Sequence, residues 1–244
     1  MPPAGTKIGA EVAKFDALAA RWWDPDGPMK PLHRMNPLRT GWIAERIARL
    51  HGRDPGAPDA LAGLTILDVG CGAGLASEAL ARRGARVTGL DAAGEALEAA
   101  RAHAAAQGLD IAYREGLPEE LAEGETFDAV IALEVIEHVA DRAAFLAALA
   151  RAARPGAPVF LSTLNRTPRA FLMAKIGAEY LLRLLPVGTH DWRMFVTPGE
   201  LGAGLRQAGM TVRDITGMVM EPLSGRWRAS RDVGVNYMVM ARRG

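Results

Sequence analysis

Short apolar runs alternate with longer segments of helical spacing through the middle of the chain. The longer segments, rich in alanine and leucine, lie at 75–83, 95–107 and 143–154. The apolar runs have the length of buried strands and lie at 65–69, 86–91, 111–113, 127–133 and 158–163. Strands alternating with helices predict right-handed βαβ units and a parallel sheet that is covered on both faces.

The segments on either side of this region are less regular. Helical spacing is expected at 14–23, which ends in a pair of tryptophans, and again at 40–50. Later in the chain, 168–185 is amphipathic. Thr197 and Glu200 have capping-box spacing with proline at the first helical position, which predicts a helix to about Ala208. Two last strands are expected at 210–216 and 235–241, which brings the expected sheet to seven strands.

Composition narrows the class of protein. The chain has 244 residues, 49% hydrophobic and 23% charged, which is enough for a large core. A net charge of +1 argues against nucleic acid as a partner bound through bulk charge. The single cysteine, Cys71, excludes a disulfide within the chain and fits a reducing cytoplasm. No secretion signal and no stretch of about 20 apolar residues is present, so we expect a cytoplasmic protein that at most attaches to a membrane surface.

The most informative segment is Gly70-Cys-Gly-Ala-Gly74, which follows the strand at 65–69. Three glycines leave the main chain bare, so that a ligand can approach it at the carboxyl end of the sheet. Asp91 ends the next strand about 20 residues later, where a carboxylate can accept hydrogen bonds from ribose hydroxyls. A dinucleotide fingerprint would need glycine or alanine where Leu75 or Ser77 stands, and no Walker lysine follows.

This spacing resembles motif I of the class I S-adenosylmethionine-dependent methyltransferases, and Asp91 resembles the acid that holds the ribose in that family. The run 127–133 resembles the family's fourth-strand motif, with Leu133 expected beside the cofactor. The resemblance implies S-adenosylmethionine as cofactor and an α/β, Rossmann-like class I methyltransferase fold. The sheet would be mostly parallel and seven-stranded.

Three polar residues follow the fourth strand. If this segment is helical, Glu134, Glu137 and His138 stand at i, i+3 and i+4 on one face. Three interpretations stay open: they are ligands of a divalent cation such as Mg²⁺, Glu137 and His138 supply a catalytic base, or the group is structural. A phenol with a pKa near 10 is a poor nucleophile at pH 7, and either a base or a metal would favour the phenolate.

The flanks carry a closer resemblance, to the ubiquinone-biosynthesis O-methyltransferase family. It runs from about Phe15 to Met240, with signatures at 21–24, 32–39, 162–166, 177–180, 188–192 and 235–238. Members methylate ring hydroxyls of polyprenylated catechol and hydroquinol intermediates. The resemblance implies that Arg39 binds S-adenosylmethionine alongside Gly70, Gly72, Asp91 and Leu133. Two alternatives remain, a methyltransferase for another small-molecule phenol and a non-catalytic cofactor-binding scaffold.

The same resemblance implies how the chain is divided. Residues 1–60 are expected to form an N-terminal helical extension of one domain, and 61–244 to form the methyltransferase domain with a helical lid insertion at about 165–195. The amphipathic segment 166–185 either packs on the sheet as a lid or contacts anionic lipid at the inner membrane face. An insoluble polyprenyl substrate favours membrane contact, and membership of a ubiquinone-biosynthesis complex would fit as well.

Overall fold

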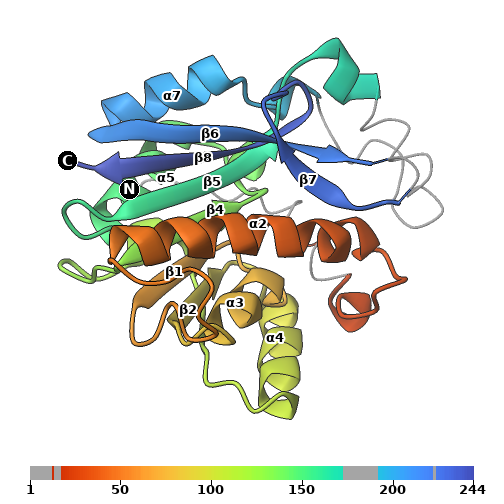
Figure 1. Ribbon diagram of the computed structural model, residues 1–244, viewed down its shortest axis with the longest axis vertical. Coiled ribbons are helices and arrows are strands. Elements are labelled where there is room, and N and C mark those ends of the chain that lie inside the picture. Colours follow the sequence, from red (N-terminus) through yellow and green to blue (C-terminus); the bar gives the residue numbers. More distant parts are fainter. Residues whose placement is uncertain (1–12, 14–17, 173–191, 222–223) are drawn as a thin grey trace.

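The computed structural model describes residue 13 and residues 18–172, 192–221 and 224–244. A single eight-stranded sheet runs through it, with strand order β3-β2-β1-β4-β5-β8-β6-β7 (Figure 1). Each neighbouring pair from β3 to β5 is parallel, whereas β8 is antiparallel to both β5 and β6. The strands are β1 (Thr65–Val69), β2 (Arg86–Asp91), β3 (Ala112–Glu115), β4 (Ala129–Leu133), β5 (Pro158–Leu164), β6 (Met210–Met220), β7 (Trp227–Ser230) and β8 (Asn236–Arg243).

Helices pack on both faces of this sheet. The helices α2 (Lys30–Leu50) and α3 (Leu75–Ala81) share one apolar cluster with the sheet, and α5 (Arg142–Ala152) and α7 (Pro198–Gln207) share another. The helix α4 (Gly94–Ala106) packs beside β3. Short 3₁₀ helices are η1 (Ala19–Arg21), η2 (Pro118–Glu120), η3 (Ile136–His138) and η4 (Trp192–Met194).

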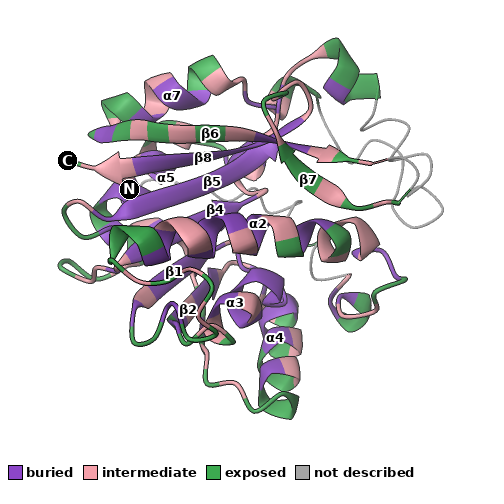
Figure 2. Ribbon diagram, viewed as in Figure 1, coloured by how far each residue is buried: buried purple, intermediate pink, exposed green. Residues whose placement is uncertain are grey.

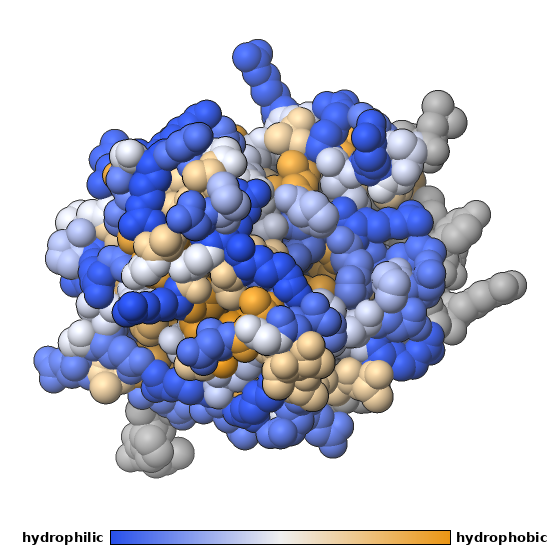
Figure 3. Space-filling model, turned by 60° about the horizontal axis from the view of Figure 1, so that its bottom comes forward, coloured by the Kyte–Doolittle hydropathy of each residue, from blue (hydrophilic) through white to orange (hydrophobic). Residues whose placement is uncertain are grey.

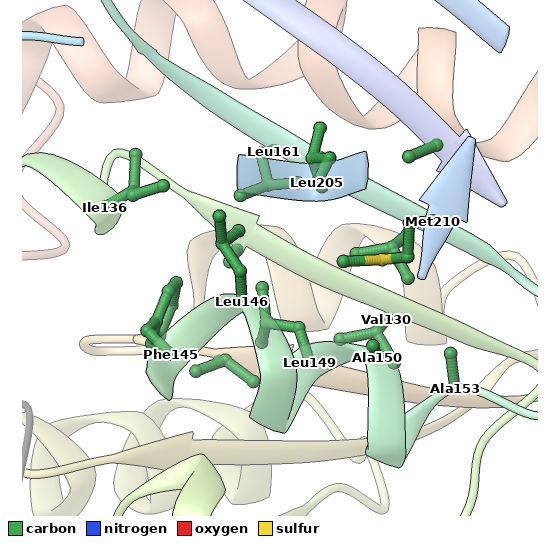
Figure 4. Close-up of a cluster of buried hydrophobic side chains, with 14 of the residues drawn as sticks. Val130, Ile136, Phe145, Leu146, Leu149, Ala150, Ala153, Leu161, Leu205 and Met210 are labelled. Carbon is green, nitrogen blue, oxygen red and sulfur yellow. The ribbon is translucent and has the colours of Figure 1, made fainter. Parts of the chain in front are cut away.

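The central strand β4 explains the two clusters. All five of its residues are buried, because helices cover both of its faces (Figure 2). Val130 and Ala132 point into the cluster that α5 and α7 close, while Ile131 points into the cluster beneath α2. Figure 4 shows the cluster that α5 and α7 close, in which Leu146 and Leu149 of α5 pack against the sheet.

The predicted α/β, Rossmann-like class and the five alternating strands are confirmed, but the strand number is not. The four-residue strand β7 pairs with β6 where the sequence indicated a loop, and β6 runs on to Met220. Trp227-Arg-Ala-Ser230 alternates apolar and polar residues, but four residues are too few for this pattern to predict a strand, and none of them is buried.

The N-terminal region also differs from expectation. The helix predicted at 40–50 begins ten residues earlier, at Lys30, and contains Pro37. Its first turn accommodates Pro31, because the N–H that proline lacks would have no helical partner there. The part of 14–23 that is described contains only the short helix η1, and most of the expected lid lies outside the described residues.

The surface carries both polar and apolar areas. On the face in Figure 3, hydrophilic side chains cover most of the molecule and hydrophobic side chains show between them. None of the helices in the described ranges combines the length and the apolar character needed to cross a membrane.

Candidate functional site

The glycine loop lies between β1 and α3, at the carboxyl end of the parallel strands. Gly70, Gly72 and Gly74 have φ of +70°, +52° and +88°, values that side chains rarely tolerate. Space is as restrictive as the backbone, since a Cβ on Gly70 would lie 2.4 Å from Val135. A Cβ on Gly72 would lie equally close to Trp22. The predicted sharp bend is therefore present. Its main chain is not bare as expected, because Val135 and Trp22 pack where the side chains of Gly70 and Gly72 would point.

Asp91, at the end of β2, ties this loop to the next one. Its carboxylate accepts hydrogen bonds from the backbone N–H of Gly72 at 2.7 Å and of Ala93 at 2.8 Å. The acid predicted to hold a ribose thus lies beside the glycine loop, as the sequence indicated. It remains partly exposed, so its oxygens can accept further hydrogen bonds.

A cavity of about 270 Å³ opens next to Asp91, and sequence reasoning missed it. It is lined by Ala92, Glu115, Gly116, Leu117 and Glu120. The backbone N–H of Gly116 donates to the carbonyl of Asp91 at 2.9 Å, which joins the cavity wall to the end of β2. The available signal was the glycine that directly follows the third strand.

Arg39 is the buried cation of the site. It lies in α2 with only 4% of its surface exposed. Burial lowers its pKa, while the negative charges of nearby carboxylates, Glu134 foremost, act in the opposite direction. Its Nη2 donates to Asn36 Oδ1 at 3.4 Å, but Nε finds no acceptor among the described residues. A buried guanidinium nitrogen without a partner is costly. A carboxylate such as that of S-adenosylmethionine would supply the missing acceptor, so the residues present fit this cofactor.

A second buried charge lies on the strand that leads into the loop. Asp68, on β1, accepts a hydrogen bond from Ser77 Oγ at 2.6 Å. Burial raises the pKa of Asp68 to about 6. This contact joins the strand before the glycine loop to the helix after it, and thereby fixes the loop's two ends.

The segment after β4 is not helical at Glu134, so the condition on which the shared face of Glu134, Glu137 and His138 depended is not met. Glu134 has φ of +58°, the only positive value at a non-glycine position in the described part of the chain. One 3₁₀ turn, η3, then carries Glu137 and His138. Leu133, at the end of β4, is buried directly before this turn. The backbone reversal at Glu134 removes the shared helical face that the i, i+3, i+4 spacing implied.

The two carboxylates bind neighbouring residues of β5. Ser162 Oγ donates to Glu134 at 2.6 Å, and Thr163 Oγ1 donates to Glu137 at 2.8 Å. Successive residues of a strand point to opposite faces, so the two acids are held from different sides of the sheet. Burial, and after it the charge of Glu134, raises the pKa of Glu137 to about 8.

These residues do not fit a metal ion. In the ranges that the structure describes, no three side chains of histidine, cysteine, aspartate or glutamate come together as a ligand set. Glu134, Glu137 and His138 are therefore not brought together as metal ligands, and we assign no step to a divalent cation.

His33, His190 and the tryptophan pair, Trp22 and Trp23, are candidates to line the pocket of the methyl acceptor, and the structure describes all of them except His190. Trp22 lies on Gly72, and His33 Nε2 is 2.8 Å from the carbonyl oxygen of Trp22. His190 lies outside the described residues. The structure thus places the tryptophan pair against the glycine loop, and His33 contacts both tryptophans.

Comparison with known proteins gives consistent results. Residues 67–161 match the family described as "Methyltransferase domain". The chain is 53% identical over 243 residues to a ubiquinone biosynthesis O-methyltransferase from Methylobacterium sp. (strain 4-46), covering 99% of this chain and 98% of that protein. It is 49% identical to the protein of the same name from Pseudomonas entomophila (strain L48), covering 96% and 97%.

Solved structures show the same fold at lower identity. An S-adenosylmethionine-dependent methyltransferase from Aquifex aeolicus aligns with a TM-score of 0.62 at 15% identity, covering 96% of this chain and 98% of that chain. Magnesium protoporphyrin IX methyltransferase from Synechocystis PCC 6803, solved with bound SAH, aligns with a TM-score of 0.59 at 23% identity, covering 84% and 83%.

Proposed function

The chain belongs to the ubiquinone biosynthesis O-methyltransferase family, and on that premise we propose how its own residues perform the reaction. It is an S-adenosylmethionine-dependent O-methyltransferase. The acceptor is a ring hydroxyl of polyprenylated catechol and demethylubiquinol intermediates of ubiquinone synthesis. The observation that carries the proposal is the gathering of Gly70, Gly72, Asp91 and the unpaired Arg39 Nε around one end of the sheet.

Each of these groups suits one part of the cofactor. Arg39 would bind the carboxylate through its free Nε, and the partly exposed Asp91 would accept hydrogen bonds from the ribose. The cavity beside Asp91 would take the base, with the main chain of Gly116 and Leu117 along its wall. Leu133 would pack beside the adenosyl group from the end of β4.

Bound S-adenosylmethionine supplies a methyl group on a positively charged sulfur. When the methyl moves to the acceptor oxygen, the sulfur becomes a neutral thioether. The protein's task is to align the acceptor oxygen with that methyl and to take up the proton of the hydroxyl. We assign proton acceptance to an imidazole nitrogen of His138, because His138 is partly exposed. Glu137, predicted with it as catalytic, is buried on Thr163, and we assign it to holding the η3 turn that carries His138.

The substrate's polyprenyl tail calls for an apolar surface. Phe171, Leu172 and Trp192 are exposed at the two borders of the segment 173–191, and the rings of Phe171 and Trp192 meet edge to face at 6.2 Å. Arg166 and Arg169 nearby are already paired with Glu200 and Asp232. We assign this apolar surface to contact with the inner face of the membrane, from which the substrate would enter.

The deciding experiment is a product assay with S-adenosylmethionine and a short-chain prenyl catechol. We expect one methylated product, and a second with the matching demethylubiquinol. Cofactor binding without any product would support a different phenol or a scaffold. Activity that disappears on rigorous chelation and returns with Mg²⁺ would contradict the assignment of proton acceptance to His138 without a metal.

A further inference from the structure

A short N-terminal strap, residues 18–29, crosses the glycine loop. Trp22 of the strap is buried, and its ring would lie 2.4 Å from a Cβ at Gly72. The strap therefore covers main chain that the proposed function assigns to the cofactor. The contacts that hold the strap in place therefore determine whether Gly72 stays covered.

Trp23 fastens the strap at two points. Its indole Nε1 donates to the carbonyl of Ala73, inside the glycine loop, at 3.0 Å. Its ring also stacks on the imidazole of His103 in α4, with centroids 3.4 Å apart and planes within 4°. The second contact ties the strap to a helix that supplies none of the assigned cofactor contacts.

The imidazole of His103 is itself held in orientation. Its Nδ1 lies 2.7 Å from Glu78 Oε1, and Glu78 is buried in the helix that follows the glycine loop. The other oxygen of Glu78 accepts a hydrogen bond from Arg82 Nη2 at 2.9 Å. A carboxylate fixed at both oxygens restrains the ring that it binds, so the surface on which Trp23 stacks has one preferred orientation.

We infer that Glu78 and His103 are positioning residues for cofactor retention, which act by holding Trp23 and thus keeping the strap closed over the glycine loop. The inference rests on the proposed function, because it takes the glycine loop as the cofactor site. Neither residue lies on the η3 turn that carries His138. Loosening the stack should therefore weaken retention of the cofactor and leave the methyl transfer itself nearly unchanged.

The test compares His103→Ala with the wild-type protein. We expect the dissociation constant and KM for S-adenosylmethionine to rise about tenfold, equivalent to about 1.4 kcal/mol, with kcat within about twofold. His103→Phe keeps a flat ring for Trp23 and should recover most of the affinity. Glu98→Gln is the matched control, since Glu98 lies on the same helix, has a side chain that is 76% exposed and pairs with Arg101.

A double-mutant cycle separates the loss of the stack from a general effect of the substitutions on folding. Trp23→Leu should weaken binding at least as much, because it removes the hydrogen bond to Ala73 as well as the stack. Adding His103→Ala to it should cause little further loss, because the stack is already gone. Additive losses, unchanged affinity in folded His103→Ala, or an equal fall in kcat that His103→Phe does not rescue would each overturn the inference. If the wild-type protein fails to bind S-adenosylmethionine, the proposed function fails first.

Discussion

Single side chains at the carboxyl end of the sheet perform two tasks at once. Asp91 is the clearest case, since it joins the glycine loop to the start of α4 and would also hold the ribose. Asp91→Ala should weaken binding of S-adenosylmethionine by about 2 kcal/mol, roughly 30-fold, through lost charge-assisted hydrogen bonds. Calorimetric titration checks this. Asp91→Asn keeps one acceptor oxygen and should lose less, whereas unchanged affinity in Asp91→Ala would remove Asp91 from the site.

Glu137 links the site to stability. Because its pKa is raised to about 8, the native protein retains a proton that the unfolded chain releases near pH 4.5. The native state binds more protons in this window, so the free energy of unfolding should fall as pH rises from about 4.5 to 8. Glu137→Gln should flatten that fall by at least about 1.4 kcal/mol, the equivalent of one pKa unit.

Urea unfolding at pH 5 and pH 8 measures this difference. The wild-type protein and Glu137→Gln should differ in slope, and parallel pH profiles would contradict the buried, protonated carboxyl. A second variant tests the assigned role, because Glu137→Ala should lower kcat more than it lowers cofactor affinity if Glu137 holds the turn beneath His138.

Among the elements, α7 is the one whose start the sequence predicts most directly. Thr197 Oγ1 accepts from the N–H of Glu200, and the Glu200 carboxylate accepts from the N–H of Thr197. Thr197→Ala should reduce the free energy of unfolding by about 1 kcal/mol, because one capping bond is lost. Thr197→Ser, which keeps the hydroxyl, serves as the control in urea unfolding. An equal loss in both variants would show that the hydroxyl is not the cause.

The central strands and this cap were predictable because their signals are local. A strand that is covered on both faces can be recognised from the apolar run of its own residues alone, and Gly70 and Asp91 stand at the ends of such runs. The turn at Glu134 was not predictable, since its i, i+3, i+4 spacing is also that of a helix and the contacts with Ser162 and Thr163 come from a distant strand.

Other features depend on contacts between separate elements. The stack of Trp23 on His103 joins residues far apart in the sequence, and no periodicity indicates it. The strand β7 is defined by its pairing with β6, because its own four residues are too few to predict a strand. The helix α2 starts earlier than expected. Proline normally indicates a break in a helix, but Pro31 stands in the first turn of α2, where proline is tolerated.

For the molecule as a whole, the membrane assignment gives a direct prediction. Leu172 is 56% exposed beside the segment 173–191, and Leu172→Ser should lower co-sedimentation with anionic vesicles about twofold or more. Leu50→Ser is the matched control, because Leu50 is 40% exposed at the far end of α2. Equal binding of both variants and the wild-type protein would argue against contact through this surface.

The position of β8 affects how the molecule is made. This strand follows β6 and β7 in the chain, yet it lies between β5 and β6 in the sheet. During synthesis, β5 and β6 therefore keep unpaired edges until Asn236–Arg243 has left the ribosome. A nascent chain arrested before Asn236 should be prone to edge-to-edge aggregation and to chaperone capture, whereas release of the last strand closes both edges in one step.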